Sequence, residues 1–323
     1  RETRQKAIDI LRSISIRMPL MIYGADVPID EDIDIDRFVD LIDDSSWHEF
    51  MPKGVTKRIF ANFTKYYDRD VFIAAGKRIR RLAAAADRET PTRRVQQIAE
   101  IFRHFKNPDK ETVLTPWRVV NMHIGDCIGG WNYLDSEREA RLQEPVFIDH
   151  GEVTDKVFKD KDTRILEINS KTGLYPLYMA LSVFMEKLKA YREKHMLATD
   201  VPIDIQNELW DDVLKNHIFV VCKTEMAKSI TKRTLRGFRK SKVNARYFED
   251  LLNKITNQPQ LFTEKVTNGR LYWKNYEIED KMKFNAIVGN PPYMLTNASN
   301  SGINNATAIY QHFIEIARVI KPA

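Results

Sequence analysis

The sequence contains few cysteines and no long apolar segment. Among its 323 residues, Cys127 and Cys222 are the two cysteines, and they are far apart without metal-ligand spacing. This scarcity excludes a disulfide-stapled secreted scaffold and a cysteine-rich metal centre, and it is typical of a protein of the reducing cytoplasm. No apolar run approaches the roughly 20 residues that cross a membrane, so we expect no membrane association.

The charges are nearly balanced. Lysine and arginine number 51 against 45 aspartates and glutamates, which gives a net charge of +6. Such a mild excess permits nucleic-acid binding without demanding it. The acidic segment 26–44 is expected to form a solvated turn and a helix start. It does not show the convergent carboxylates that a metal site needs, so no metal is expected.

The first predicted region is helical and covers residues 1–108. Its two basic clusters, 77–81 and 93–94, have two interpretations. They bind nucleic-acid phosphates, or they form solvated helix faces, which is the simpler interpretation. The segment Asn107-Pro108-Asp109 is typical of a break between regions, so a second region is predicted over residues 109–323.

In the second region, short apolar segments alternate with helical patterns. Strands are predicted at 164–168, 218–222 and 284–288, and helices at 173–188, 225–236 and 306–320. Continuous apolar strands between helices favour an α/β fold with a parallel sheet that is covered on both faces.

The third predicted strand runs directly into Gly289-Asn290-Pro291-Pro292-Tyr293. Ligands of parallel sheets bind at the carboxyl ends of the strands, so this segment is expected at a site. The exocyclic amine of adenine is a poor nucleophile because its lone pair is delocalised into the ring. The Asn290 oxygen and a backbone carbonyl can accept its N–H bonds, while the prolines fix the loop in advance. Tyr293 offers a face on which a flipped base can stack.

With this motif, the chain resembles the N6-adenine DNA methyltransferases of bacterial restriction–modification fusion enzymes. The resemblance implies a Rossmann-like methyltransferase sheet preceded by a helical region, S-adenosyl-L-methionine as cofactor and double-stranded DNA as substrate. It also implies associated nuclease, helicase and target-recognition domains. The sheet is expected to be incomplete at its C-terminal end, with the chain truncated before any target-recognition domain. Residues 1–26 resemble the tail of a helicase-like region.

The resemblance also implies cofactor-binding residues. Thr115-Pro116 matches a Thr-Pro segment that lies beside the methionine part of the cofactor. The turn after the first strand matches a glycine-rich cofactor loop, although Lys171 stands where the first glycine is usual. The residues assigned to cofactor binding are Thr115, Pro116, Glu167, Asn169, Gly173, Tyr175 and Cys222.

Two acids of the family pattern are missing. Cys222 occupies the place of the acid that holds the ribose hydroxyls at the end of the second strand, and Glu225 is a possible substitute. In the family a further acid near the end of the next strand contacts the adenine of the cofactor. We expect this strand end around residues 267–272, where no aspartate occurs.

Two other functions remain open from the sequence. The same Asn-Pro-Pro-Tyr loop serves enzymes that methylate the side-chain amide of protein glutamine at N5. The altered cofactor turn is also compatible with a non-catalytic methylase-like module that binds DNA or couples other domains. The intact loop argues against the second alternative, and the long segment between the cofactor turn and the loop favours a DNA enzyme over the first.

Overall fold

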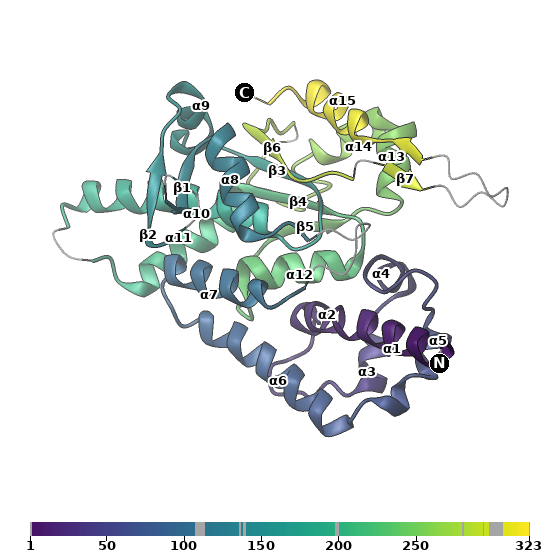
Figure 1. The fold of residues 1–323 in the computed structure, drawn as a ribbon. Coiled ribbons are helices and arrows are strands. Elements are labelled where there is room, and N and C mark those ends of the chain that lie inside the picture. Colours follow the sequence, from purple (N-terminus) through teal and green to yellow (C-terminus); the bar gives the residue numbers. More distant parts are fainter. Residues whose placement is uncertain are drawn as a thin grey trace.

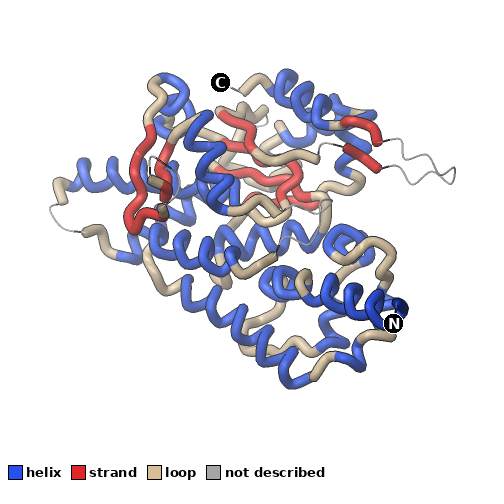
Figure 2. Tube along the Cα trace, in the orientation of Figure 1, coloured by secondary structure: helices blue, strands red, loops and turns tan. Residues whose placement is uncertain are grey.

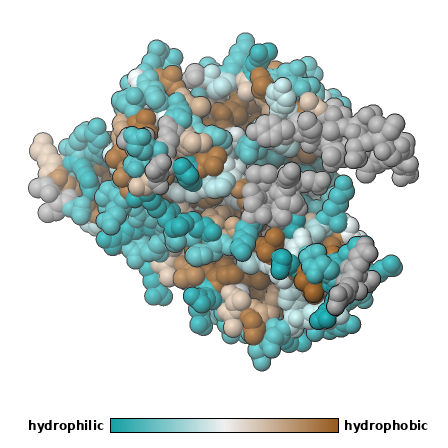
Figure 3. Space-filling model, in the orientation of Figure 1, coloured by the Kyte–Doolittle hydropathy of each residue, from teal (hydrophilic) through white to brown (hydrophobic). Residues whose placement is uncertain are grey.

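The computed structural model describes residues 2–106, 114–135, 137, 140–197, 200–279, 281–292, 294–296 and 306–322. Helices surround a central sheet, and a separate helical region lies on one side of it (Figures 1 and 2). The face shown in Figure 3 is mostly hydrophilic, with smaller hydrophobic areas between the helices.

The first hundred residues are helical, as predicted. Their elements are α1 (Glu2–Ser15), α2 (Met18–Gly24), α3 (Ile35–Leu41), α4 (Asp44–Phe50), α5 (Lys57–Ala61), a short 3-10 turn η1 (Thr64–Tyr66), α6 (Arg69–Ala86) and α7 (Pro91–Arg103). Aspartates begin three of these helices, because the side chains of Asp34, Asp43 and Asp68 accept hydrogen bonds from backbone N–H groups in the first turn.

The central sheet has four parallel strands. They are β3 (Ile165–Ser170), β4 (Ile218–Cys222), β5 (Asn244–Tyr247) and β6 (Ala286–Val288), in the order β5-β4-β3-β6. The connecting helices are α10 (Leu174–His195), α11 (Ile203–Asn216), α12 (Glu225–Arg236), α13 (Leu251–Asn257) and α14 (Pro259–Val266), with α15 (Tyr310–Ile320) after β6. The predicted mixed α/β fold with a parallel sheet is confirmed.

Alternate residues of the strands face two buried clusters. Ile218 and Val220 pack with α10, α12 and the helical region, whereas Phe219 and Val221 pack with α13, α14 and α15. Both faces of the sheet are therefore covered, which explains why the strands are apolar without alternation.

Three further pieces complete the fold. A helix α8 (Trp117–Cys127) leads into an antiparallel pair, β1 (Gly130–Leu134) and β2 (Arg141–Ile148), followed by α9 (Glu152–Thr154) and a π-helical turn η2 (Asp155–Lys159). A second antiparallel pair, β7 (Met294–Thr296) and β8 (Ala306–Ala308), precedes α15.

Several sequence predictions need correction. The strand β5 and the β1–β2 pair were not predicted, and the predicted strand 284–288 begins at Ala286. The C-terminal helix begins at Tyr310 instead of 306, because residues 306–308 pair with β7. Within this helix Phe313 and Ile316 are buried, whereas Tyr310 and Ile314 are exposed.

The two basic clusters are only partly solvated. Arg78, Arg81 and Arg93 are exposed, as expected of a solvated face. Arg80 and Arg94 are buried, so neither interpretation of the clusters holds for them. Arg80 donates to the carbonyls of Val27 and Glu31. Both arginines bind backbone carbonyls inside the protein.

Arg94 joins the helical region to the sheet domain's helix α12. Its guanidinium donates to the carbonyls of Arg233, Thr234 and Leu235 at 2.9–3.1 Å and to Asp87 at 2.9 Å. The last carbonyls of a helix lack partners within it, so Arg94 supplies donors to the buried carbonyls of Thr234 and Leu235 and adds a second donor to that of Arg233, which also accepts the N–H of Gly237.

We predict that Arg94→Ala lowers the free energy of unfolding by about 3–5 kcal/mol, because it leaves Asp87 and three carbonyls buried without this partner. Arg93→Ala is the matched control. Its side chain is exposed, so its effect should stay within about 0.5 kcal/mol. Denaturant unfolding of both variants measures the difference. Equal midpoints for the two variants would contradict the structural role of Arg94.

Candidate functional site

The strand order creates a crevice beside β3. From β3 the chain moves through β4 to β5, and it then returns to β6 on the other side of β3. In open parallel sheets, ligands bind outside the carboxyl ends of the strands at such a reversal. Glu167 of β3 lies opposite Val288 of β6 in the parallel register, so the segments that follow these two residues face the crevice.

The Asn-Pro-Pro segment begins at this crevice. The side-chain nitrogen of Asn290 donates to the hydroxyl of Thr115 at 3.1 Å. Gly289 has φ +145°, and a Cβ there would lie 3.3 Å from the carbonyl oxygen of Ile168 and 3.4 Å from Cγ of Glu167. The loop therefore leaves β6 directly against the end of β3. Pro291 and Pro292 are half-buried, and Tyr293 lies outside the described residues.

The end of β3 carries two buried polar atoms that point to a ligand. Glu167 is 5% exposed and Asn169 is 7% exposed. Oε2 of Glu167 and Oδ1 of Asn169 have no hydrogen-bond partner among the described residues. Asn169 also has a left-handed backbone, with φ +68°. Buried polar atoms without partners are costly, so these two are candidates to bind a ligand.

Burial also changes the charge of Glu167. Loss of hydration raises the pKa of Glu167 from its ordinary value of 4.5 to about 8, against a smaller lowering by its hydrogen bond with Ser170. The carboxyl is therefore largely protonated at neutral pH, and a nearby cation would favour its ionised form.

The turn that follows β3 packs tightly against α12. Gly173 has φ +77°, which favours glycine, and a Cβ there would lie 3.0 Å from Cα of Thr231. The hydroxyl of Thr234 donates to the carbonyl of Thr172 at 2.7 Å. The turn therefore has its shape fixed by α12. Tyr175, in the first turn of α10, is buried and its hydroxyl bonds Nδ1 of His123 on α8 at 2.9 Å.

Cys222 ends β4 beside this turn. Its side chain is fully buried and its sulfur is 3.8 Å from the hydroxyl of Thr231. Burial raises the pKa of the thiol, and the charges of Glu167 and Glu49 raise it further, so it stays neutral. The suggested substitute Glu225 is exposed and forms an ion pair with Lys228.

The prediction that the next strand ends near residues 267–272 is wrong. Residues 267–272 follow α14 and do not end a strand of the described sheet. The strand after β4 is β5, which ends at Tyr247 and is followed by Glu249 and Asp250, both exposed. The short, half-polar sequence Asn-Ala-Arg-Tyr gave no strand signal.

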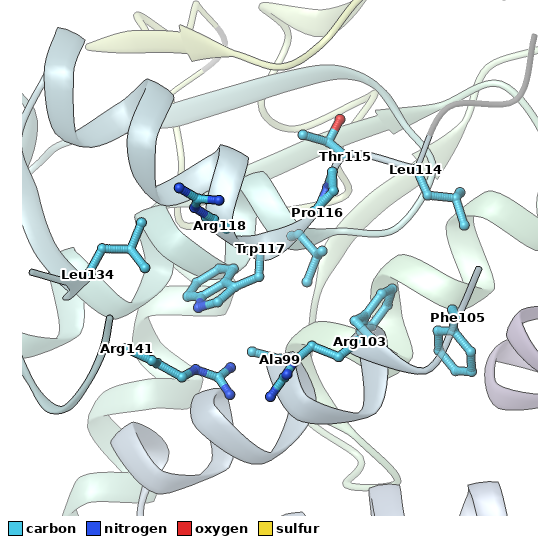
Figure 4. A pocket seen from close by; sticks show the side chains of 12 residues that line it. Ala99, Arg103, Phe105, Leu114, Thr115, Pro116, Trp117, Arg118, Leu134 and Arg141 are labelled. Carbon is cyan, nitrogen blue, oxygen red and sulfur yellow. The ribbon is translucent and has the colours of Figure 1, made fainter. Parts of the chain in front are cut away.

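A cavity of about 480 Å³ lies between α7, the start of α8 and the β1–β2 pair. Thr115 and Pro116 line it together with Leu174, whereas the other predicted site residues do not. Figure 4 shows Trp117, Arg103 and Arg141 around its centre, with the Thr115 hydroxyl directed away from them. Its volume is in the range of small-molecule sites. The crevice beside β3 remains the better candidate because the buried polar atoms are there.

Within the described ranges, no helix has the length and apolar character to cross a membrane. The same residues contain no cluster of three or more histidine, cysteine or acidic side chains placed to hold a metal ion.

Two comparisons bear on what this site is. Residues 216–323 match the family model described as Eco57I restriction-modification methylase. The resemblance to a restriction–modification methylase is confirmed. A stretch of 41 residues is 51% identical to an uncharacterized adenine-specific methylase of Mycoplasma pneumoniae, and it covers 13% of this chain. The chain spans about a tenth of the length of that curated relative, since the match covers 10% of it.

The methylase match includes β4, α12, β5 and the Asn290 loop, but it begins after Thr115, Glu167 and Gly173. The restriction-modification methylase match therefore covers the part of the candidate site that carries Asn290. Thr115 lies outside the matched residues, and the fold brings it into contact with Asn290.

We predict that Glu167→Gln stabilises the protein in a pH-dependent way. The raised pKa means that wild type loses stability as pH rises from about 4.5 towards 8, because the unfolded carboxyl ionises while the buried one does not. The advantage of the variant should grow by about 3 kcal/mol between about pH 4 and pH 7. Denaturant unfolding across this range measures it, with Glu208→Gln on the exposed surface of α11 as the control. A difference that does not change with pH would contradict the assignment.

Proposed function

We propose that this chain forms the cofactor-binding and catalytic part of a cytoplasmic, S-adenosylmethionine-dependent DNA methyltransferase that acts on N6 of adenine in a restriction–modification system. The observation that carries the proposal is the hydrogen bond between Asn290 and Thr115 at the strand reversal. The strand order β5-β4-β3-β6 supports a Rossmann-like methyltransferase sheet. The methylase match supports DNA over protein glutamine as the substrate.

The residues at the crevice fit this cofactor. When bound, S-adenosylmethionine supplies a methyl group on a cationic sulfonium. Glu167 and Asn169 would hold its polar groups with the buried oxygens that lack partners among the described residues. Thr115 and Pro116 would flank it, Gly173 would allow close backbone approach, and Tyr175 and Cys222 would support the turn beneath it. Lys171 in place of a glycine predicts modest affinity.

Asn290 would activate the adenine amine. Its bond to Thr115 uses the nitrogen side of the amide and fixes the plane of the side chain. The oxygen side would accept one N–H bond of the amine, and a backbone carbonyl of the loop would accept the other. The nitrogen lone pair would then leave conjugation with the ring and be available as the nucleophile. Pro291 and Pro292 stiffen the loop, so the acceptors need little rearrangement. Tyr293 would stack on the base.

The wider organisation is also part of the proposal. Residues 1–108 would form a helical region and residues 109–323 the methyltransferase core. Double-stranded DNA would be the partner, and target recognition would belong to a further domain, because sequence is read by side chains that reach base edges. Fused or associated nuclease and helicase domains would complete the restriction–modification enzyme.

Cofactor binding should release a proton at pH 7. Glu167, with its pKa of about 8, is largely protonated before binding, and a cationic ligand favours its ionised form. Calorimetric titration with S-adenosylmethionine in buffers of different ionisation enthalpy should show about one proton released per ligand. Glu167→Gln should bind without this release. A proton release that is unchanged in the variant would show that another group contacts the cofactor.

Asn290→Ala should abolish methylation in the enzyme that contains this chain. Loss of a preorganised acceptor costs about 3 kcal/mol, which is a hundredfold or more in kcat. Asn257→Ala on the exposed surface of α13 is the matched control and should keep full activity. Methyl transfer to DNA under saturating cofactor gives the rates, and circular dichroism checks the fold. Near-normal turnover of the Asn290 variant would exclude the amine-activation mechanism.

A further inference from the structure

A carboxylate from the helical region lies at the carboxyl end of β4. The Thr224 hydroxyl, two residues beyond the end of the strand, bonds Oε2 of Glu49 on α4. Glu49 is 8% exposed and Thr224 is 2% exposed, so the contact is inside the protein. The strand itself ends in Cys222 and offers no acid there.

The contact is held by a second one on the same face of α4. The hydroxyl of Ser46 accepts a hydrogen bond from the backbone N–H of Met226 at 3.0 Å. Ser46 and Glu49 are three residues apart and therefore share one face of the helix. Together they dock α4 on the first turn of α12, whose partial positive charge favours a carboxylate.

The position also borders the crevice at β3. Cys222 pairs with Ser170 in the register of β4 and β3, so the carboxyl ends of these two strands lie side by side. Oε2 of Glu167 and Oδ1 of Asn169 are buried nearby and lack partners among the described residues. The strand end that Glu49 approaches is thus the neighbour, in the sheet, of the strand that carries Glu167.

The chemistry of this place suits a ribose. In open parallel sheets that bind nucleosides, a glycine-rich turn follows one strand, and an acid lies at the end of the neighbouring strand. This acid accepts hydrogen bonds from the ribose hydroxyls. A carboxylate has about four acceptor positions, so it can hold a vicinal diol as well as a threonine hydroxyl. Cys222 is neutral, buried and directed at Thr231, and it cannot take this role.

We propose that Glu49, from the helical region, supplies the carboxylate that binds the ribose hydroxyls of the cofactor in place of the acid missing at Cys222. The inference rests on the proposed function and refines it, since it makes α4 a wall of the cofactor site. Movement of the helical region relative to α12 would then change cofactor affinity.

The test compares the riboside with its deoxy analogue. Calorimetry gives the Kd of S-adenosylhomocysteine and of its 2′-deoxyribose analogue for the intact chain. Wild type should prefer the riboside at least about tenfold, because a site built around a hydroxyl leaves a buried acceptor unpaired when the hydroxyl is absent. Glu49→Gln keeps the shape but loses the charge-assisted bonds, so the riboside should bind about tenfold more weakly and the preference should fall to about threefold or less.

Two variants separate ligand contact from docking. Ser46→Ala removes the other α4–α12 contact and should lower stability without changing the ribose preference. Glu49→Asp keeps the charge with a shorter reach and should reduce the preference, and it replaces Glu49→Gln if that variant does not fold. A wild type that binds both ligands equally, or Glu49 variants that keep the full preference, would overturn the inference. A wild type that binds neither ligand would instead overturn the proposed function.

Discussion

Helix α12 is held at both ends by the helical region, and the rest of the site depends on this clamp. Ser46 and Glu49 meet its first turn, and Arg94 binds the carbonyls of its last turn. Between them, Arg233 donates to the carbonyls of Tyr23 and Ala25. On its other side, α12 fixes the turn after β3 through Thr231 and Thr234. The shape of the turn is therefore set by residues far upstream in the sequence as well as by its own sequence.

The sequence predicted those parts of the fold whose signal is local and apolar. Strand β4 and helix α12 begin and end at the predicted residues, because five consecutive apolar residues and a Thr cap mark them. Strand β5 escaped detection since it lies at the sheet edge and begins with Asn244, whose amide bonds the carbonyls of Lys215 and Ile218. That stabilisation comes from tertiary partners, which no pattern of four residues reveals.

The distinction between local sequence signals and tertiary contacts also decides which site residues could be predicted. Asn290 could be found because its neighbours form a continuous motif, and Thr115 could be assigned only through a family resemblance. Their contact joins positions 175 residues apart. Glu49 carries no signal at all in the sequence, because it belongs to an ordinary amphipathic helix and becomes a site candidate only through its contact with Thr224. Arg80 and Arg94 show the converse case. Their sequence context is typical of a solvated helix face, but both side chains are buried and donate to backbone carbonyls.

The two buried acids, Glu167 on β3 and Glu49 on α4, differ in what surrounds them. A buried carboxyl without a cation is held in its neutral form, and Glu167 follows this rule. Glu49 instead lies beside the first turn of α12 and accepts the hydrogen bond of the Thr224 hydroxyl. The two acids are thus suited to different groups of one ligand. Glu167 is neutral and has an oxygen without a hydrogen-bond partner among the described residues, so it suits a cationic group that would favour its ionised form. Glu49 already accepts a hydrogen bond from Thr224, and it suits neutral hydroxyls, which need only an acceptor. A ligand with a positive end and a diol would offset the cost of burying the Glu167 carboxyl without a partner, and it would add hydrogen bonds at Glu49. The docking of α4 on α12 would then contribute to cofactor selection as well as to stability.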